Sequence, residues 1–385
     1  MNRKIYSAVD QAKSFVQREL NYTFTLPVQV LLFMTYRCTS QCKMCKIWRA
    51  GETCDPNKEL TLEEWKQCLD NIGLKRLKSV EIFGGDSLLR KDVSIPLVEY
   101  VHQKNSKIYI DYPTNCNLLD KQTAFDLVRA GVTNMYISLD APPQIHDKIR
   151  GRSGTCSSVE HAIHFLRAAR DELKIDRPEI RVNCTISSLN VNEFEQIIPI
   201  CEECGADVVE FEYVGEFKQE HIDQTTVNGL HPTPFYVSPE KSNLLSYEQA
   251  VLLKRKMKHI RDMQEKSRMK LITYAIDALT IDNMVKGTVP NDKCYYCRYC
   301  AAINPYGDVI GCFHYNNYVI GNVKKESFES MWNTGRHRQF LDAQKRGDIK
   351  LCEHCVSGVN RNPSFRQSLY RGLYFNLKNK GFDTL

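Results

Sequence analysis

The chain has 385 residues, of which 42% are hydrophobic, and a formal net charge of +6. This is typical of a globular protein with two or three domains. The mild charge, without a strong basic block, gives no reason to expect nucleic-acid binding. Residues 1–7 lack the apolar stretch of an export signal, and the longest apolar run, near Val28, is far shorter than the roughly 20 residues that cross a membrane, so we expect no transmembrane segment.

An apolar stripe over residues 1–25 predicts an amphipathic N-terminal helix. A second stripe repeats every four residues from Phe365 to Leu377 and predicts a C-terminal helix. Basic side chains accompany both stripes, so either helix could lie on a membrane surface or reach a lipid substrate. We favour docking on the rest of the protein. The N-terminal stripe consists of Ile5, Val9, Ala12, Val16 and Leu20.

Six short runs rich in β-forming residues recur along the chain, with helical patterns between them. Alternating strands and helices predict a parallel sheet with right-handed crossovers. Six units suit an α/β fold built as an open (βα)6 barrel, with the chemistry at the C-terminal ends of the strands. The predicted strands are Val28 to Thr35, Ser79 to Phe83, Lys107 to Tyr112, Asn134 to Leu139, Ile180 to Ile186 and Asp207 to Tyr213.

The helical patterns carry recognisable start and stop signals. Thr61 and Glu64 have the spacing of a capping box that opens a helix, and Asp120 caps another helix that stops at Gly131. An apolar pattern from Asn192 predicts a further helix before Gly205.

Residues 215–243 break this rhythm with three prolines, two glycines and two histidines. The segment is too long and irregular for a simple connection, and we interpret it as a loop that covers the substrate. We therefore expect an N-terminal helix over residues 1–25, the barrel over 26–245, a helical linker over 246–290, and a cysteine-rich domain with a C-terminal helix over 291–385.

Cys38, Cys42 and Cys45 form a C-x3-C-x2-C motif in the loop after the first predicted strand. Three thiolates leave one iron of a four-iron cluster without a protein ligand, so such a site is open to a further ligand. A structural zinc site is the alternative, but zinc normally takes four protein ligands, and only Cys54 lies near enough to be the fourth. The sixteen cysteines cluster at metal-ligand spacings rather than as a secreted disulfide scaffold, which favours the reducing cytoplasm.

This motif resembles the signature of the radical S-adenosylmethionine (SAM) superfamily, C-x3-C-x-hydrophobic-C, with Met44 at the hydrophobic position. The resemblance implies a partial TIM-type barrel and a 4Fe-4S cluster whose open iron binds SAM. It further implies that one electron, supplied by a flavodoxin- or ferredoxin-type donor, cleaves SAM to a 5'-deoxyadenosyl radical that abstracts hydrogen from the substrate.

Three further segments are similar to SAM-binding elements of that family. Gly84, Gly85 and Asp86 follow the second strand and resemble its Gly-Gly-Glu segment, with Asp in place of Glu shortening the reach by roughly 1.5 Å. Thr114-Asn115-Cys116 resembles its Thr-Asn-Gly element. Ser138 and Arg150 stand in segments similar to its Ser-Leu-Asp and His-Asp-x-x-Arg-Gly elements, which makes them candidates for the SAM carboxylate and ribose.

A second group of cysteines occupies the C-terminal region and brings soft ligands together from distant segments. Its pattern resembles the SPASM extension of radical SAM enzymes, but no cysteine follows Cys355, so the resemblance implies a single auxiliary 4Fe-4S cluster. A zinc ribbon is the alternative, and Cys297 and Cys300 could compete as ligands. The expected ligands are Cys294, Cys312, Cys352 and Cys355.

Acid–base candidates are less well defined by the pattern. Glu212 and Tyr213 end the sixth predicted strand, where alternation turns some side chains into the barrel, and His314 follows an expected cluster ligand.

Together these features predict an enzyme that oxidises a small natural product of the sugar or aminocyclitol type, with the auxiliary cluster as electron acceptor. A peptide is the second candidate substrate, because only some 25 residues precede the first strand, too few for a leader-peptide recognition domain. A lipid is the third. The alternative from another class is a non-catalytic zinc-binding scaffold.

Overall fold

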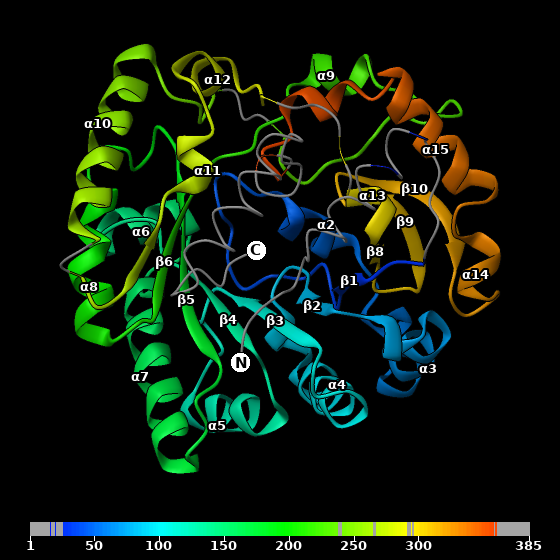
Figure 1. The fold of residues 1–385 in the computed structure, drawn as a ribbon, viewed down its shortest axis with the longest axis horizontal. Coiled ribbons are helices and arrows are strands. Elements are labelled where there is room, and N and C mark those ends of the chain that lie inside the picture. The colour runs from blue at the N-terminus through cyan, green and yellow to red at the C-terminus, as the bar shows by residue number, and fades with distance from the viewer. Residues whose placement is uncertain are drawn as a thin grey trace.

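A computed structural model describes residues 26–237, 241–264, 267–290, 294, 296–357 and 359, together with Val16 and Leu20. In this part of the chain ten strands form one sheet in the order β10-β9-β8-β1-β2-β3-β4-β5-β6-β7. Figure 1 shows the sheet curving round a central axis with helices outside it. The strands are Gln29–Phe33 (β1), Ser79–Phe83 (β2), Tyr109–Thr114 (β3), Asn134–Ser138 (β4), Glu179–Ile186 (β5), Val208–Tyr213 (β6), Lys270–Ile272 (β7), Cys300–Ile303 (β8), Asp308–Cys312 (β9) and Tyr315–Asn322 (β10).

Helices connect most successive strands of the parallel part of the sheet and cover its outer face (Figure 1). The α-helices are Ile47–Thr53 (α2), Leu62–Ile72 (α3), Lys91–Lys104 (α4), Lys121–Ala130 (α5), Pro143–Arg150 (α6), Thr155–Leu173 (α7), Ile197–Cys204 (α8), Gln219–Asp223 (α9), Tyr247–Met263 (α10), Tyr274–Asp277 (α11), Ile281–Lys286 (α12), Tyr296–Tyr299 (α13), Phe328–Met331 (α14) and Gly335–Arg346 (α15). Short 3-10 helices are Pro56–Lys58 (η1), Leu74–Arg76 (η2), Ser87–Arg90 (η3), Phe194–Gln196 (η4) and Lys350–His354 (η5).

The six predicted strands are confirmed as β1 to β6, all in parallel register. In β2 to β5, buried and mostly apolar side chains alternate with half-buried and mostly polar ones. The apolar set faces the helices, and the polar set faces the barrel interior. Leu31, Glu81 and Asp111 are neighbours in register across β1, β2 and β3, so an acidic pair lies on this inner face.

Four strands outside the predicted six extend the sheet. β7 pairs in parallel with β6, so the segment 246–290, expected to be a helical linker, also contributes a strand. β8 pairs in parallel with β1, with Val30 opposite Ala301. The C-terminal cysteine-rich region is therefore joined to the barrel by its sheet, and β9 and β10 continue from β8 as antiparallel strands.

The capping signals act as predicted. The Thr61 side chain accepts a hydrogen bond from the backbone N–H of Glu64, whose side chain accepts one from the Thr61 N–H, which completes the capping box of α3. Asp120 caps α5, which ends at Gly131 in the left-handed conformation. The helix predicted before Gly205 is α8.

Two apolar clusters lie on opposite sides of β1. The larger fills the space between the sheet and the helices and includes fully buried Trp65 of α3. The smaller lies on the inner side and joins Phe33 to Ala302 of β8, to Phe235 of the long loop and to Phe313. This inner cluster packs the long loop and the C-terminal region against the strand that leads into the first cysteine motif.

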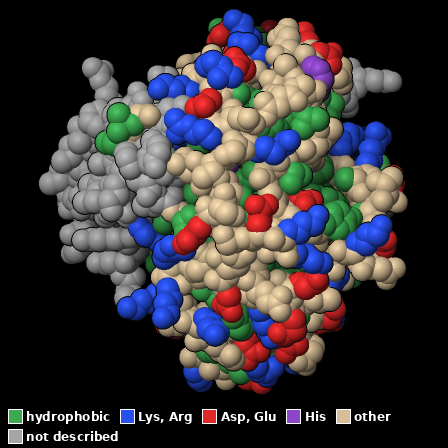
Figure 2. Space-filling view, turned by 90° about the vertical axis from the view of Figure 1, so that its right-hand side faces the viewer, with side chains coloured by type: hydrophobic (Ala, Val, Ile, Leu, Met, Phe, Trp, Pro, Cys, Tyr) green, Lys and Arg blue, Asp and Glu red, His purple; other side chains and the backbone are tan. Residues whose placement is uncertain are grey.

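The predicted N-terminal helix over residues 1–25 lies outside the described residues apart from exposed Val16 and Leu20, and so does the stripe from Phe365 to Leu377. Within the described residues, no helix is both long and apolar enough to span a bilayer. On the face shown in Figure 2, acidic and basic side chains are interspersed over the described surface.

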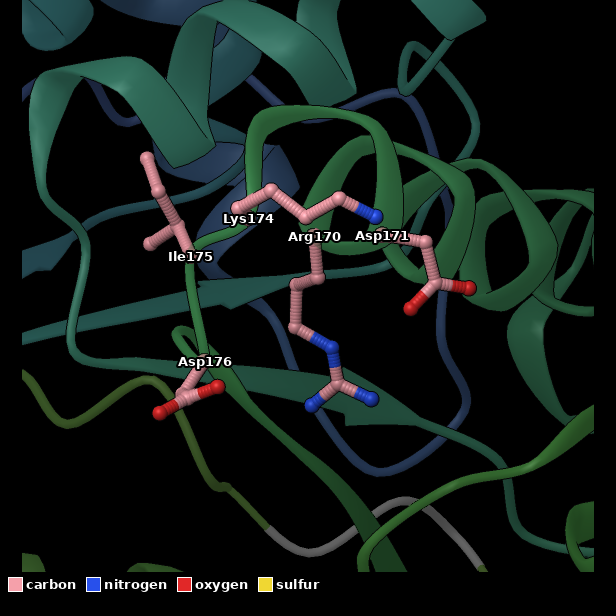
Figure 3. A pocket seen from close by; sticks show the side chains of 5 residues that line it. All are labelled: Arg170, Asp171, Lys174, Ile175 and Asp176. Carbon is pink, nitrogen blue, oxygen red and sulfur yellow. The ribbon is translucent and has the colours of Figure 1, made fainter.

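A surface depression of about 370 Å³ lies where α7 leads into β5, at the N-terminal end of the parallel strands (Figure 3). Its lining includes Arg170, which binds the carboxylate of Asp207 at 2.6 Å. The depression is therefore at the end of the barrel opposite the loop that carries the first cysteine motif.

Candidate functional site

The first three cysteines lie in the loop between the C-terminal end of β1 and α2, with Cys42 buried and Cys38 and Cys45 half-buried. Burial, and then the charge of nearby Cys42, raises the pKa of the Cys38 thiol to about 11 and that of Cys45 to about 12. The three thiols are neighbours, because the charges of Cys42 and Cys38 both act on Cys45. Bound irons would stabilise the thiolates that burial disfavours, so the donor set fits an iron-sulfur cluster.

The glycine pair after β2 lets the cysteine loop pass closely. A β carbon on Gly84, whose φ is 142°, would lie 2.5 Å from the Thr35 carbonyl oxygen, and one on Gly85 would lie 2.1 Å from that of Arg37. The same two oxygens accept hydrogen bonds from the backbone N–H of Gly85 at 2.9 Å and of Asp86 at 2.8 Å. Both glycines therefore seat the start of the cysteine loop on the end of β2.

A polar cluster holds the middle of the loop. The buried Asp86 carboxylate accepts a hydrogen bond from the Thr39 hydroxyl at 2.5 Å and from the Leu88 N–H at 3.2 Å, and burial raises the pKa of Asp86. Asn115, just beyond β3, donates from Nδ2 to Thr39 Oγ1 at 3.0 Å and to Cys38 Sγ at 3.8 Å. Two predicted SAM-binding residues thus lie directly beside the cysteine loop.

Arg150, at the end of α6, is held between a carboxylate and a cysteine. Its Nε donates to Asp140 Oδ2 at 2.7 Å and its Nη1 to Cys42 Sγ at 3.9 Å. The Asp140 side chain is fully buried and also accepts a hydrogen bond from the Thr185 N–H at 3.0 Å. Two nitrogens of the guanidinium are therefore engaged by the protein.

A buried ion pair fixes the entry to the loop. Glu59, whose side chain is fully buried, accepts hydrogen bonds from Thr35 Oγ1 at 2.5 Å, from Arg37 Nη2 at 3.1 Å and from Arg90 Nη1 at 2.7 Å. Thr35 and Arg37 start the cysteine loop, and Arg90 ends η3 after the glycine pair. One carboxylate thus links the ends of β1 and β2.

The other predicted ligand-facing residues occupy different environments. Ser138, half-buried at the end of β4, lies opposite Asn183 in register. Glu212 is half-buried on β6. Tyr213, by contrast, is buried on the helix side, where its hydroxyl donates to the Met284 carbonyl at 2.6 Å and accepts from the Leu245 N–H at 3.0 Å. The structure does not bring Tyr213 to the barrel interior.

Met44 is buried between Cys42 and Cys45 in the same loop and packs into the larger apolar cluster. Its side chain anchors the loop to the core.

Tyr236 of the long loop lies between the two cysteine regions, a position that the sequence pattern did not reveal. Its ring is 5.4 Å from that of His314, which is two residues past Cys312. Burial raises the pKa of the Tyr236 phenol, and the charges of Cys45, Glu212 and Cys42 raise it further. These groups therefore surround the phenol from the cysteine loop and from β6.

The long loop is held in place by its backbone. Tyr236 O accepts a hydrogen bond from the Phe217 N–H at 2.8 Å, and Phe235 O accepts one from the Lys46 N–H at 2.6 Å. The Phe235 ring lies 5.5 Å from that of Tyr36. These contacts attach the loop to the first cysteine motif.

The C-terminal cysteines gather at one place. Cys294 and Cys312 both hydrogen-bond Cys297 and raise its pKa, while burial and then the charges of Cys294, Cys355 and Cys312 raise the pKa of Cys352. The four expected ligands are thus brought together, and Cys297 joins them as a fifth thiol. Cys300, in contrast, packs into the inner apolar cluster at the start of β8.

A histidine pair connects the long loop with these cysteines. The rings of His221 in α9 and His354, between Cys352 and Cys355, stack with centroids 3.5 Å apart and an angle of 11°. His314, buried beside Tyr236, places its Nε2 3.4 Å from Ser357 Oγ. The His221–His354 stack and the contact of Tyr236 with His314 bring the loop and the second cysteine group together.

Comparison with known proteins identifies two domains. The sequence profile of the radical SAM superfamily matches residues 32–177, and that of the SPASM iron-sulfur cluster-binding domain matches residues 294–356. The first implies a 4Fe-4S cluster with SAM and the second an auxiliary iron-sulfur cluster, which confirms the cofactors expected from the cysteine patterns.

The matching curated relatives include a peptide cyclase and a heme synthase. A PqqA peptide cyclase of Bradyrhizobium diazoefficiens is 29% identical over 196 residues, which is 50% of this chain and 48% of the relative. An AdoMet-dependent heme synthase of Methanosarcina barkeri is 24% identical over 333 residues, which is 83% of this chain and 87% of that one. The match thus spans about half of the cyclase and most of the synthase, and neither name points to a sugar or aminocyclitol.

Two solved structures share the fold. Streptococcus suis SuiB bound to the precursor peptide SuiA has a TM-score of 0.62 at 13% identity, over 92% of this chain and 77% of that chain. The enzyme anSMEcpe with bound AdoMet has a TM-score of 0.62 at 18% identity, over 93% of this chain and 96% of that chain. At these identities the likeness concerns the fold alone, and it confirms the predicted barrel with a C-terminal iron-sulfur domain.

Proposed function

This chain is a radical SAM protein with a SPASM domain, and we propose that it cleaves SAM reductively to remove hydrogen from a peptide bound between its two cysteine sites. The observation that carries the proposal is the position of Tyr236. Its phenol faces the charges of Cys42, Cys45 and Glu212, while its ring contacts His314 beside the second cysteine group. A substrate next to Tyr236 would lie within reach of both sites.

The metal ligands follow from the two cysteine groups. We assign Cys38, Cys42 and Cys45 to the cluster that binds SAM. Cys294, Cys312, Cys352 and Cys355 would hold the auxiliary cluster, with Cys297 as the thiol that could replace one of them. When bound, the first cluster supplies the one-electron cleavage of SAM to the hydrogen-abstracting 5'-deoxyadenosyl radical, and the second supplies an acceptor for an electron from the substrate.

The remaining residues of the loop region would hold SAM. Gly84 to Asp86, Asn115 and Ser138 lie at or just beyond the C-terminal ends of β2, β3 and β4. Asp86 is the group for the SAM amine, because a carboxylate accepts hydrogen bonds from an ammonium. Ser138 is the group for the carboxylate or ribose hydroxyls, and Met44 shapes the loop from its apolar side.

Substrate oxidation needs a group that accepts one proton from the substrate. Loss of a hydrogen atom to the nucleoside, followed by loss of one proton and one electron, is a net two-electron oxidation. Glu212 is the proposed proton acceptor, because it is a half-buried carboxylate at the C-terminal end of β6 beside Tyr236. The Tyr236 hydroxyl and His314 would orient the substrate, whereas Tyr213 serves the packing of β6 on α12.

The charge of the barrel favours a peptide over a substrate rich in carboxylates. Glu81, Asp111 and Glu210 face the interior with Glu212, and buried Arg181 is paired with Glu179 and Glu210. Such a lining disfavours the propionate groups of a heme-type substrate and suits amide, hydroxyl or ammonium groups. We propose a flavodoxin- or ferredoxin-type electron donor and a cytoplasmic location, where the sixteen cysteines, none in a disulfide, persist as thiols.

Anaerobic reconstitution with iron and sulfide, followed by reduction in the presence of SAM, tests the activity. We expect 5'-deoxyadenosine from the wild-type chain, none from Cys42→Ala, and continued SAM cleavage by Cys352→Ala without substrate oxidation. Colourless protein that binds zinc and leaves SAM intact would instead identify a scaffold.

The substrate class needs a second assay. Peptides and amino sugars are each supplied to the wild-type enzyme and to Glu212→Gln, with deuterium transfer from substrate to 5'-deoxyadenosine as the readout. We expect transfer from a peptide in both enzymes and oxidised product only from the wild type, since Gln cannot accept the proton. Transfer from amino sugars alone would replace the peptide assignment.

A further inference from the structure

The cysteine sulfurs receive hydrogen bonds of two kinds. Cys294 and Cys312 accept from the backbone N–H two residues ahead, at 3.3 and 3.4 Å, and backbone N–H groups of Ser40 and Ile47 act on Cys38 and Cys45 in the same way. Cys42 instead accepts from the guanidinium of Arg150, at 3.9 Å. Of the side-chain donors described for Cys38, Cys42 and Cys45, Arg150 is the one that carries a charge.

The position of Arg150 is fixed from several sides. The Gln41 N–H donates to the Arg150 carbonyl at 3.0 Å, and the Lys43 N–H donates to the Ile149 carbonyl at 2.9 Å, so backbone bonds hold the end of α6 on both sides of Cys42. Gly151 permits this approach, because a β carbon there would lie 2.5 Å from the Gln41 carbonyl oxygen. With Asp140 engaging Nε, the guanidinium has little freedom to leave the sulfur.

We propose that Arg150, oriented by Asp140, is a positioning residue that sets the reduction potential of the SAM-binding cluster through its hydrogen bond to Cys42. Reduction adds negative charge to a cluster, so a cationic donor on a ligand sulfur stabilises the reduced form and raises the potential. The Asp140 carboxylate opposes part of that effect. The neutral amide of Asn115, which donates to Cys38 at 3.8 Å, acts in the same direction as Arg150 but more weakly.

Substitutions of Arg150 and of Asp140 should therefore shift the reduction potential in opposite directions. Removing the guanidinium should lower the potential, and removing the charge of Asp140 should raise it. A role confined to holding α6 on the loop would not produce opposite shifts, because loss of either partner would loosen the same contact. A role in binding the SAM carboxylate would leave the SAM-free cluster unchanged.

The test is a redox titration of the reconstituted full chain, followed by electron paramagnetic resonance without SAM. The signal that changes when SAM is added identifies the cluster of Cys38, Cys42 and Cys45. For Arg150→Gln we expect the ratio of reduced to oxidised cluster at a fixed potential to fall about tenfold, which for one electron is a shift of about 59 mV. Asp140→Asn should shift the ratio the other way, and Asn115→Leu should lower it by less.

Arg170→Gln is the matched control. Arg170 binds Asp207 at 2.6 Å, and Asp207 accepts a hydrogen bond from the Ile180 N–H at 2.7 Å, much as Asp140 accepts one from Thr185. That pair lies at the opposite end of the barrel, so its loss should leave the potential unchanged.

The inference rests on the assignment of the SAM-binding cluster, and the two can fail separately. If no SAM-sensitive signal forms in the wild type, the proposed function is wrong. If the signal forms and Arg150→Gln keeps the wild-type potential, or Asp140→Asn shifts it in the same direction as Arg150→Gln, the tuning role is wrong. Should Arg150→Gln fail to hold iron, the shifts in reduction potential of Asp140→Asn and Asn115→Leu still test the predicted directions.

Discussion

Gly85 offers a sharp test of how the barrel seats its first cysteine motif. A β carbon at this position would lie 2.1 Å from the Arg37 carbonyl oxygen and 2.7 Å from the Tyr36 oxygen. An ordinary contact is 3.4 to 4 Å, so Gly85→Ala must move the loop by at least roughly 1 Å. Overpacking of this kind costs about 1 to 3 kcal/mol, and a shift of roughly 1 Å at a reacting site can reduce the rate about a hundredfold.

The assay compares iron content, SAM cleavage and thermal unfolding of reconstituted Gly85→Ala with those of Gly154→Ala. Gly154 has a φ of +80°, and a β carbon there would have nothing within 4 Å, so its substitution costs about 1 kcal/mol of backbone strain without moving the loop. We expect Gly85→Ala to lose most SAM cleavage and Gly154→Ala to keep it. Full iron content and a wild-type rate in Gly85→Ala would refute the reasoning.

The remaining predictions concern stability. Burial lowers the pKa of His146 to about 4, below the value near 6.5 in the unfolded chain. Between pH 7 and 5 the unfolded chain therefore binds a proton that the folded chain does not, so the free energy of unfolding should fall by about 2 kcal/mol over this range. His146→Gln should flatten that dependence in denaturant titrations. Thr61→Ala removes the capping box of α3 and should cost about 1 kcal/mol by the same measurement, whereas no change would mean that the cap contributes nothing. Glu59→Gln leaves Arg37 and Arg90 without their shared buried carboxylate and should cost about 3 kcal/mol and reduce iron loading; equal stability and loading would contradict the linking role.

The sequence was a good guide to the parallel barrel because its evidence is local. Strand runs, capping residues and the C-x3-C-x2-C spacing can each be read within a few residues, and β1 to β6 and α3 lie where these patterns predicted. β7 was missed because three residues at 270–272 carry no periodicity. The side of the strand that Tyr213 faces depends on which residue begins the alternation. In the structure its hydroxyl donates to the Met284 carbonyl of α12, on the helix side.

The parts of the site that the sequence did not reveal depend on contacts between distant segments. Tyr236 comes from an irregular loop, and its place beside Cys45 depends on the backbone bonds of Phe217 and Phe235. Cys297 stood as a spare thiol in the pattern because three cysteines lie close together there, and only folding separates it from Cys300. The engagement of Arg150 by Asp140 likewise requires the geometry of α6.

The pairing of β8 with β1 has a consequence for how the protein is made. Val30 meets Ala301, so the strand that carries the first cysteine motif has an open side until about 300 residues have been synthesised. Closing so long a stretch of chain is slow compared with forming the neighbouring β1–β2 pair. The strand that leads into the cysteine loop is therefore among the last parts of the barrel to gain both of its neighbours.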